Sequence, residues 1–426
     1  MSAGTVPLKR LFSSVRGGAW GTEPGTDEVT LPCVRGTDFD YAHLRVDLSS
    51  APLRGFSRAD VAVRAATRGD LIIEKSGGGE TQPVGRVALH DHDELVMPTN
   101  FAGRLRPARD VDSRFACYVF ASLYSGGRTR AAIKQTTGIQ NLDLDALLAT
   151  RVRCPELPEQ RAVADYLDRE TARIDALIEK KHSAAELLLE RWLAALCSRL
   201  LGRKRHEPFS RVEQSAAGEL TLIPLKRLLE HVWSGDWGGE PGSNDIDLTC
   251  IRAADFDFAL LEASGGVDRS FAATSVRGRA LLPGDLVIEK SGGGDGVPVG
   301  RVVVWRGPGL AMPTNFAGAM RPDPRFDPDF VLLVFRAAYE IGLPWRSIKQ
   351  TTGLQNLDMT HYLSQHWPVP DVPEQRRVAS ELMEELRSCR KAQELFHRQI
   401  DLLREHRQAL ITAAVTGGLE VPGVAA

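Results

Sequence analysis

The chain has 426 residues, with 53 Lys and Arg against 55 Asp and Glu, so its formal net charge is −2. Hydrophobic residues make up 43% and charged residues 25%, which excludes a disordered chain, a collagen and a disulfide-stapled miniprotein. The length predicts roughly two to four domains, and the charge balance excludes a protein that binds nucleic acid through an overall positive charge. Any contact with DNA must therefore come from local patches.

The cysteines and the N-terminus indicate the cellular compartment. Six cysteines occur singly, without a Cys-x-x-Cys pair: Cys33, Cys117, Cys154, Cys197, Cys250 and Cys389. This spacing predicts neither a zinc site nor a disulfide framework, so we expect reduced thiols. The N-terminus lacks the apolar core of a signal peptide, and no apolar run approaches the ~20 residues that cross a bilayer. We expect a soluble, cytoplasmic protein without a membrane partner.

The chain is an internal duplication. Residues 7–11 (PLKRL) recur as 224–228, an offset of 217, and after a two-residue slip residues 97–103 (MPTNFAG) recur letter for letter as 312–318, an offset of 215. Further matched blocks are 73–79 with 288–294, 83–87 with 298–302, 133–138 with 348–353, 140–143 with 355–358, and 158–161 with 373–376. Matches in register over this length indicate two copies of one structural unit.

Each copy begins with a segment rich in Gly and Pro. Short apolar runs at 71–73, 87–89 and 302–304 predict strands between turns, and longer helical stretches are expected around 115–123 and 330–339. We predict a globular α/β (α+β) domain over 1–155 and again over 224–370. A linker is expected at 206–223 and a tail at 419–426.

Each copy continues into a long helix, expected within 156–205 and 371–418. No Gly or Pro follows Pro158 until Gly202, and the second run, from Pro373, stops at Gly417. Apolar residues recur at steps of three, four and seven: Val163, Leu167, Ile174, Ile178, Ala185, Leu188, Trp192 and Leu196, then Val378, Leu382, Leu386, Cys389, Phe396, Ile400, Leu403 and Leu410. Such a helix would span about 66 Å. The seam favours helix-on-helix, coiled-coil packing over a helix that lies on its own domain.

Two polar motifs each allow a structural and a binding interpretation. In Glu-Lys-Ser-Gly-Gly-Gly the Lys precedes the glycines, which excludes a phosphate loop of the Gly-x-x-x-x-Gly-Lys type. The motif predicts either a hairpin turn with positive φ or a loop whose bare backbone approaches a ligand. The Ile-Lys-Gln-Thr-Thr-Gly motif, followed by Gln-Asn-Leu-Asp, predicts either a helix N-cap made by Thr or Asn or a DNA contact through Lys and amides.

No catalytic motif is present in the sequence. The Asn-Phe pairs at 100–101 and 315–316 resemble the Asn-Pro-Pro-aromatic loop of amino-methyltransferases but lack both prolines. Residues 1–155 carry 20 basic and 17 acidic residues, and residues 224–370 carry 14 and 17, so the two domains have charges of +3 and −3. We expect partners to supply part of the phosphate neutralisation if the protein binds DNA.

The order of these segments, present twice, resembles the specificity (S) subunit of type I restriction-modification systems. The resemblance covers nearly the whole chain. It is carried by residues 69–87 (GD…IEKSGGG…PVGRV), by the Gln-Thr-Thr-Gly-Ile-Gln-Asn-Leu block, by Pro-Glu-Gln-Arg at the start of each long helix, and by the ending at 402–417. One departure is the end of the first helix, where residues 192–197 (WLAALC) replace the more usual Arg-x-Ala-Leu-Ile.

The resemblance implies two pseudo-symmetric target-recognition domains separated by two long antiparallel coiled-coil helices. Each domain would read one half of a bipartite site in double-stranded DNA. Two DNA-methyltransferase (M) subunits would dock on the helices and methylate adenine, and restriction/translocase (R) subunits would join them. The methyltransferase would bind S-adenosylmethionine. This chain, which would be prokaryotic, would bind no cofactor and would have no catalytic role. The alternative is a duplicated coiled-coil adaptor that binds peptide or glycan.

The repeat also sorts the candidate DNA-binding residues. Residues shared by both copies are candidates for the fold, the phosphates or the methyltransferase, and residues that differ are candidates for base contacts. The shared candidates are Lys75, Ser76, Arg86, Lys134, Gln135 and Thr136, with Lys290, Ser291, Arg301, Lys349, Gln350 and Thr351. The differing candidates are Arg16 and Ala19 against Trp233 and Asp236, Thr81 and Gln82 against Gly296 and Val297, and Arg128 and Arg130 against Pro344 and Arg346. We assign no catalytic residue and no metal ligand.

Overall fold

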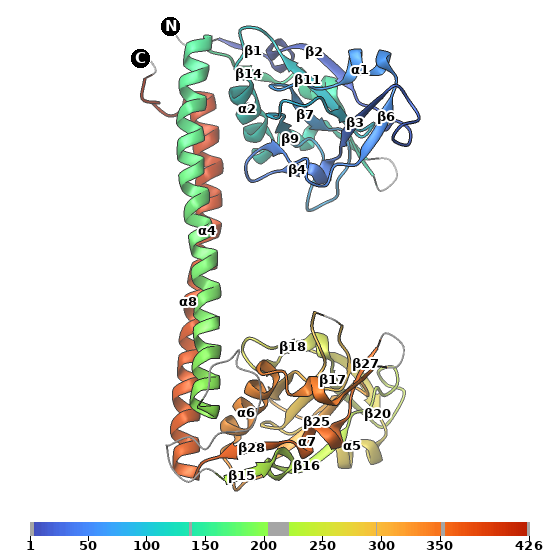
Figure 1. The fold of residues 1–426 in the computed structure, drawn as a ribbon, viewed down its shortest axis with the longest axis vertical. Helices are drawn as coiled ribbons and strands as arrows, with labels where there is room; N and C mark the ends of the chain where they lie inside the picture. The colour runs from blue at the N-terminus through green and yellow to red at the C-terminus, as the bar shows by residue number, and fades with distance from the viewer. Residues whose placement is uncertain (1–3, 136–138, 203–220, 295, 351–353, 424–426) are drawn as a thin grey trace. The chain divides into compact units, whose positions relative to one another are not determined.

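A computed structural model describes residues 4–135, 139–202, 221–294, 296–350 and 354–423 (Figure 1). The contacts divide the chain into two units, Met1–Lys181 with Arg398–Ala426, and His182–His397. Each unit therefore combines the globular domain of one repeat with one segment of each long helix. The sequence pattern predicted the helices but not this division within them.

The first domain is a mixed α/β domain built on a six-stranded sheet in the order β2-β11-β7-β9-β5-β4. A three-stranded sheet (β10-β3-β6), a second (β12-β13-β8) and a two-stranded pair (β1-β14) complete it. The bounds are β1 Thr5–Pro7, β2 Phe12–Gly17, β3 Val29–Val34, β4 Phe39–Asp40, β5 Arg45–Val46, β6 Leu53–Phe56, α1 Arg58–Arg64, β7 Leu71–Glu74, β8 Ser76–Gly77, β9 Val87–Leu89, β10 Met97–Pro98, β11 Ala102–Pro107, α2 Ser113–Ser125, β12 Ile133–Gln135, β13 Gln140–Leu142, α3 Leu144–Leu148 and β14 Arg151–Arg153.

The second domain repeats this topology strand for strand. Its sheets have the orders β16-β25-β21-β23-β19-β18, β20-β17-β24, β22-β27-β26 and β15-β28. The bounds are β15 Thr221–Pro224, β16 Leu229–Ser234, β17 Ile246–Ile251, β18 Phe256–Asp257, β19 Glu262–Ala263, β20 Val267–Phe271, α5 Ala273–Arg279, β21 Leu286–Glu289, β22 Ser291–Gly292, β23 Val302–Trp305, β24 Ala311–Pro313, β25 Ala317–Pro322, α6 Pro328–Glu340, β26 Ile348–Gln350, β27 Gln355–Leu357, α7 Met359–Ser364 and β28 His366–Val369. The predicted mixed α/β fold, built twice, is confirmed.

One buried helix completes the core of each domain. In α2 the side chain of Asp112 caps the helix by accepting from the backbone N–H of Arg114 and Phe115, and Phe115 and Phe120 are fully buried. In α6 Asp327 caps the helix in the same way, with Pro328 in its first turn. Helix α2 packs on β9, and helix α6 packs on β23. The start of each helix, set by its cap residue, is therefore consistent with the apolar face that the helix buries.

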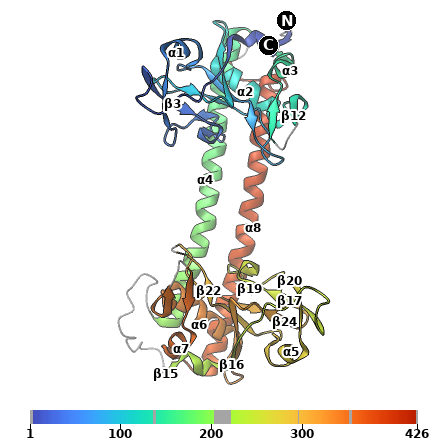
Figure 2. The ribbon, with the colours of Figure 1, turned by 90° about the vertical axis from the view of Figure 1, so that its right-hand side faces the viewer.

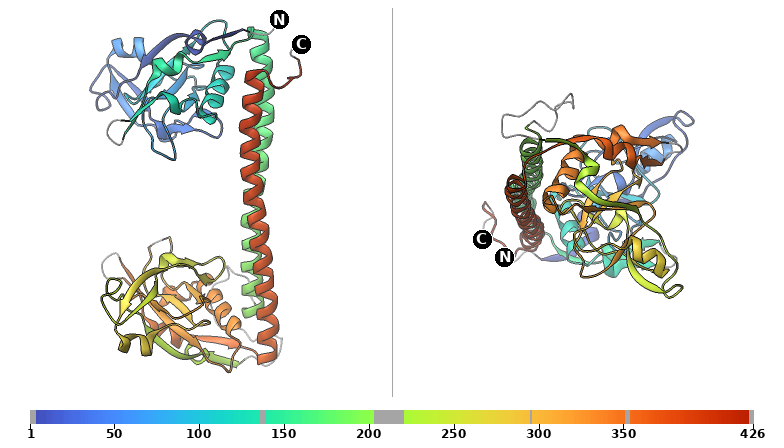
Figure 3. Two further views of the ribbon diagram at one scale, coloured as in Figure 1. Left: turned by 180° about the vertical axis from the view of Figure 1, so that it is seen from behind. Right: turned by 90° about the horizontal axis from the view of Figure 1, so that it is seen from below.

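The long helices are α4 (Leu157–Leu201) and α8 (Val372–Thr416), and their segments lie side by side and antiparallel within each unit (Figures 2 and 3). In the first unit Ile174 and Ile178 of α4 form a buried cluster with Ile400 of α8. In the second unit the indole of Trp192 donates to the Leu382 carbonyl over 2.9 Å. The predicted helix-on-helix packing is confirmed.

The long helices also pack on the globular domains. Both interpretations of the seam therefore apply: helix packs on helix, and each helix also packs on a domain. Val163 and Leu167 join the core of the first domain, and Val378 and Leu382 join that of the second. Trp192 belongs to residues 192–197, the segment in which the sequence departs from the pattern that it otherwise resembles, and it is 2% exposed. None of the described helices combines the length and the apolar character needed to cross a membrane.

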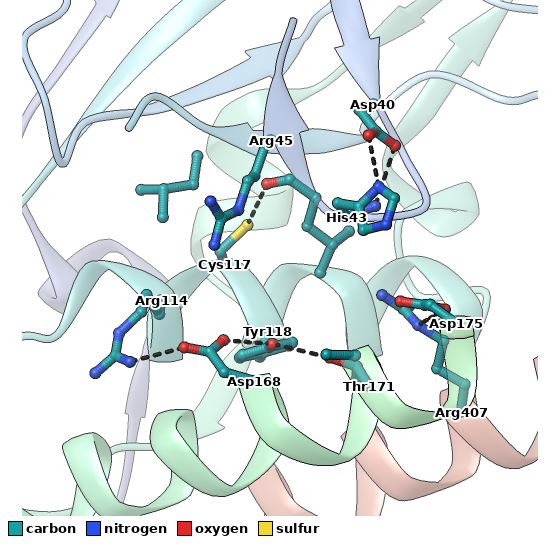
Figure 4. Close-up of a pocket in the computed structure, with 13 residues that line it drawn as sticks. Asp40, His43, Arg45, Arg114, Cys117, Tyr118, Asp168, Thr171, Asp175 and Arg407 are labelled. Atoms are coloured by element: carbon teal, nitrogen blue, oxygen red, sulfur yellow. Dashed lines mark hydrogen bonds and ion pairs between the residues drawn. The ribbon is translucent and has the colours of Figure 1, made fainter. Parts of the chain in front are cut away.

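The junction between domain and helix pair differs between the two units. In the first unit it contains an open pocket of about 320 Å³ with both polar and apolar lining residues (Figure 4). There Tyr118 donates its hydroxyl to Asp168 of α4 over 2.7 Å, and Arg114 pairs with the same carboxylate at 2.7 Å. The positions that correspond to Tyr118, Asp168 and Thr171 in the second repeat are Leu333, Met383 and Leu386, all buried. These three positions are therefore polar in the first junction and apolar in the second, where Arg336 pairs with Glu340 and Arg390 with Asp257.

Two local predictions need correction. The expected linker at 206–223 ends in strand β15, which begins at Thr221, while residues 203–220 lie outside the described part of the chain. The Ile-Lys-Gln motif forms the hairpin β12–β13 instead of a helix start, and the following helix α3 is capped by Asp143. Asp143 accepts from the Ala146 N–H because a carboxylate caps as well as a hydroxyl or an amide.

Candidate nucleic-acid interface

The two polar motifs that the sequence presents separately lie in one small sheet. Strand β8 of the Gly-rich motif pairs with β13 of the hairpin, so that Ser76 lies opposite Asn141 and Gly77 opposite Gln140. The second domain has the same register between β22 and β27. Each domain therefore presents one composite surface made of the Gly-rich loop and the hairpin.

The amides of this surface hold the loop in place. The Gln140 side chain, 7% exposed, accepts from the Val84 N–H over 3.2 Å and donates to the Gly79 carbonyl over 3.3 Å. The Ser76 hydroxyl donates to Asn141 over 2.7 Å. In the second domain Gln355 and Ser291 make the same hydrogen bonds. These groups are used within the fold and stabilise the loop as a rigid platform.

The hairpin-turn interpretation of the Gly-rich motif is confirmed. Gly77 and Gly78 have φ values of +116° and +62°, and a Cβ on Gly78 would lie 2.8 Å from the backbone of Gln82 and Val84. At Gly79, by contrast, an added Cβ would meet nothing within 4 Å. The first two glycines are required by the turn, whereas the third has open space at its Cα while its N–H donates to the Gln82 carbonyl.

Lys75 and Lys290 lie half-buried beside this platform. Burial lowers the pKa of both amines. A Cβ on Gly103 would come within 3.4 Å of the Lys75 side chain, so glycine leaves room for its methylenes along β11. Lys290 donates to the Ser234 hydroxyl over 2.9 Å. Both lysines are thus aimed along the six-stranded sheet, next to the strands that carry Arg16 and Trp233.

Arg86 and Arg301 are engaged within their domains. Arg86 pairs with Glu74 at 3.3 Å and its guanidinium lies 3.5 Å from the ring centroid of Tyr41. Arg301 pairs with Glu289 at 2.8 Å, and this hydrogen bond raises its pKa. Burial raises the pKa of the Glu74 carboxyl against the opposing effect of Arg86. A contact of either arginine with DNA would have to compete with a largely buried ion pair.

The remaining candidates fall into three groups. The side chains of Arg16, Gln82, Arg128, Arg130 and Arg346 are exposed, and Lys134 and Lys349 are 72% exposed while paired with Asp143 and Asp358. In the second group, the side chain of Trp233 is fixed within its domain, because its indole donates to the Arg279 carbonyl and its ring stacks on His231. Thr136 and Thr351, and the side chains of Gln135 and Gln350, lie outside the described part of the chain.

The structure corrects one pairing between the repeats. Gly85 lies against Thr129, and its counterpart Gly300 lies against Pro344, so the offset here is 215. Arg130 therefore corresponds to Trp345, which is 58% exposed, and not to Arg346. An exposed cation in one domain stands where the other has an exposed indole, a larger chemical difference than the sequence comparison had indicated.

In the sequence Phe101 and Phe316 stood out only as part of the Asn-Phe pairs and were not among the DNA-binding candidates, yet they are 55% and 53% exposed. The available signal was an aromatic residue inside a block that is identical in both copies. Among the described residues no group of His, Cys, Asp and Glu is placed to hold a metal ion.

Solved structures share this architecture along its whole length. The HsdS subunit from Thermoanaerobacter tengcongensis is similar to it with a TM-score of 0.55 and 16% identity, covering 98% of this chain and 97% of its own. The chain has the fold of an HsdS subunit. A chain from a structure of a type I R-M system, solved to explain its complex assembly and conformational transition, matches with a TM-score of 0.70 and 17% identity over 98% of both chains. Comparisons with protein-family models and with curated proteins found no match.

Proposed function

We propose that this chain is the DNA sequence-recognition subunit of a type I restriction-modification complex. Each domain reads one half of a bipartite site. The helices α4 and α8 carry two adenine-methyltransferase subunits, which bind S-adenosylmethionine, and motor-nuclease subunits join the assembly. The chain itself recognises DNA in the cytoplasm and catalyses nothing.

One observation carries this proposal: a single chain with the HsdS fold builds the same rigid surface twice, with different side chains around it. The platform formed by Gln140, Asn141 and Ser76 is repeated by Gln355, Asn356 and Ser291. The exposed neighbours differ, as at Arg130 and Trp345. Identical platforms with different exposed side chains suit two readers of different sequences.

The charges predict how the DNA affinity depends on partners. Domain charges of +3 and −3 are too small for tight binding to a polyanion. The methyltransferase subunits would supply further phosphate contacts. We therefore expect specific DNA affinity only in the complex, and a steep fall of that affinity with salt concentration.

Methylome sequencing tests the proposal directly. The chain is expressed together with its methyltransferase in a host that lacks other DNA methylation, and a host with the methyltransferase alone is the control. We expect one bipartite adenine-methylated sequence that appears only with both chains. A chain in which Arg130→Trp is combined with Thr81→Gly and Gln82→Val should alter one half of that sequence. Methylation that is independent of this chain contradicts the proposal and favours the adaptor function.

A further inference from the structure

Each domain carries an exposed phenylalanine ring at the same place in the fold. Phe101 and Phe316 lie at the turns between β10 and β11 and between β24 and β25, inside the identical MPTNFAG blocks. Their exposed fractions are 55% and 53%, and the preceding Asn100 and Asn315 are also exposed. The two tips are therefore alike in sequence, in position and in exposure.

The backbone of each tip is fixed to the Gly-rich platform. The Phe101 carbonyl accepts from the N–H groups of Lys75 and Ser76 over 2.7 and 3.1 Å. The Phe316 carbonyl accepts from Lys290 and Ser291 over 2.9 and 3.0 Å. Two hydrogen bonds to one carbonyl hold the turn firmly, so the backbone that carries the exposed ring has a defined position.

The fold does not use these rings. Among the described residues neither ring belongs to a buried hydrophobic cluster or makes an aromatic contact. The other exposed aromatic pair shared by the repeats, Trp20 and Trp237, differs in this respect. Arg54 covers the ring of Trp20 at 4.9 Å, and Arg269 covers that of Trp237 at 4.6 Å. The phenylalanines are thus identical in both repeats without serving the core, which points to a common ligand.

The surroundings of the rings suit nucleic acid. Lys75 lies directly beside the Phe101 tip, and the exposed Arg16 belongs to β2, which pairs with β11 next to the tip. A solvent-exposed aromatic ring on a fixed turn beside cationic side chains can stack on a base or enter a base step, as apolar wedge residues do. A ring that is the same in both domains cannot distinguish two different half-site sequences.

We propose, on the basis of the proposed function, that Phe101 and Phe316 each insert against a base step of their own half-site, as wedges that contribute affinity but no sequence preference. The chemistry requires only the π-face of a base, which every nucleotide has. The neighbouring side chains that differ between the domains then read the adjacent bases.

Affinity measurements on the assembled complex test this proposal. The probe is a short duplex that carries the sequence found methylated, and a duplex with both half-sites scrambled is the reference. Phe101→Ala and Phe316→Ala should each weaken binding about 10- to 100-fold, the range of one lost stacking contact. Phe101→Trp should keep most of the affinity. The matched controls are Leu95→Ala and Leu310→Ala, which remove exposed apolar side chains before β10 and β24 and should leave the affinity unchanged.

A base analogue locates the wedge. 2-Aminopurine is placed at successive positions of one half-site, and its fluorescence rises where a base is unstacked. We expect a rise in one half-site that Phe101→Ala abolishes, while the signal in the other half-site depends on Phe316. Unchanged affinity and fluorescence in both alanine variants, with native circular dichroism, overturn the wedge. A changed methylated sequence, or loss of the methyltransferase from the purified complex, also overturns it. If the unaltered complex does not bind the duplex, the proposed function itself fails.

Discussion

Arg407 of α8 forms an ion pair with Asp175 of α4, with 3.1 Å between Nε and Oδ1 (Figure 4). Its guanidinium also donates to the carbonyl of Ala42 in the first domain. The two side chains are only 7% and 17% exposed. One side chain thus connects both long helices to the first domain. The residue of α4 that corresponds to Arg407 is Trp192, in the second unit, where the counterpart of Asp175 is Arg390, which pairs with Asp257.

Arg407→Leu should therefore destabilise the first unit. The substitution leaves the Asp175 carboxylate buried without its cation, a loss of about 3–5 kcal/mol in the free energy of unfolding. Urea unfolding followed by circular dichroism measures the change. Arg404→Ala, which removes an exposed pair with Asp401 on the same helix, is the control and should change the stability by less than about 0.5 kcal/mol. Equal effects of the two variants would contradict a junction held by Arg407.

Gln140→Ala should loosen the Gly-rich platform. The buried N–H of Val84 loses its acceptor, which costs about 1–3 kcal/mol locally. Hydrogen exchange at the Val84 amide should become faster, while exchange in the second domain stays unchanged. Gln82→Ala removes an exposed amide from the same loop and should not alter the exchange.

Gly18→Ala should disrupt the first domain. A Cβ at this position would lie 1.9 Å from the Pro98 carbonyl oxygen, so the backbone of one strand must move, at a cost of about 3 kcal/mol or more. Thermal unfolding of the purified chain measures this. Gly79→Ala meets no atom within 4 Å and should be neutral for stability. A destabilised Gly79→Ala variant would show that the loop is packed more closely than described.

The carboxylate of Asp38 should make the first domain sensitive to acid. Burial raises its pKa, but hydrogen bonds from Arg35 and Ser50 outweigh burial and leave the pKa below the ordinary value. A lowered pKa in the folded state means that the stabilisation is present at neutral pH and is lost as the pH falls through and below the ordinary value of 3.8. In chemical denaturation at several pH values, the stability difference between the unaltered chain and Asp38→Asn should shrink toward low pH. A difference that is constant with pH would contradict this role.

The thiols should differ in reactivity. Burial raises the pKa of Cys33 to about 11 and the pKa values of Cys117 and Cys250 to about 12, so little thiolate forms at neutral pH. Cys154 and Cys389 are only partly buried. Iodoacetamide followed by peptide mass spectrometry should therefore modify these two first, and all six cysteines should react after denaturation. Early modification of Cys33 would show that its strand opens readily.

The sequence by itself determined the duplication, the α/β character of both domains and the two long helices. These features depend on local periodicity and on start and stop residues. The helix expected within 156–205 is observed as Leu157–Leu201, and Gly202, the predicted stop, has a φ of +66°. The seam at Ile174, Ile178 and Ile400 followed equally from its spacing, because a helix places residues three and four apart on one face.

Only the tertiary structure decided which polar residues face solvent and which are used inside the fold. Arg86 and Arg130 were both DNA-binding candidates in the sequence, yet Arg86 forms a largely buried ion pair with Glu74 while Arg130 is exposed. The pairing of β8 with β13 joins residues 65 positions apart, Ser76 and Asn141, and no local pattern records that register. Strand pairing is set by contacts distant in sequence, so the interface and its exposed Phe101 became visible only when the chain was folded.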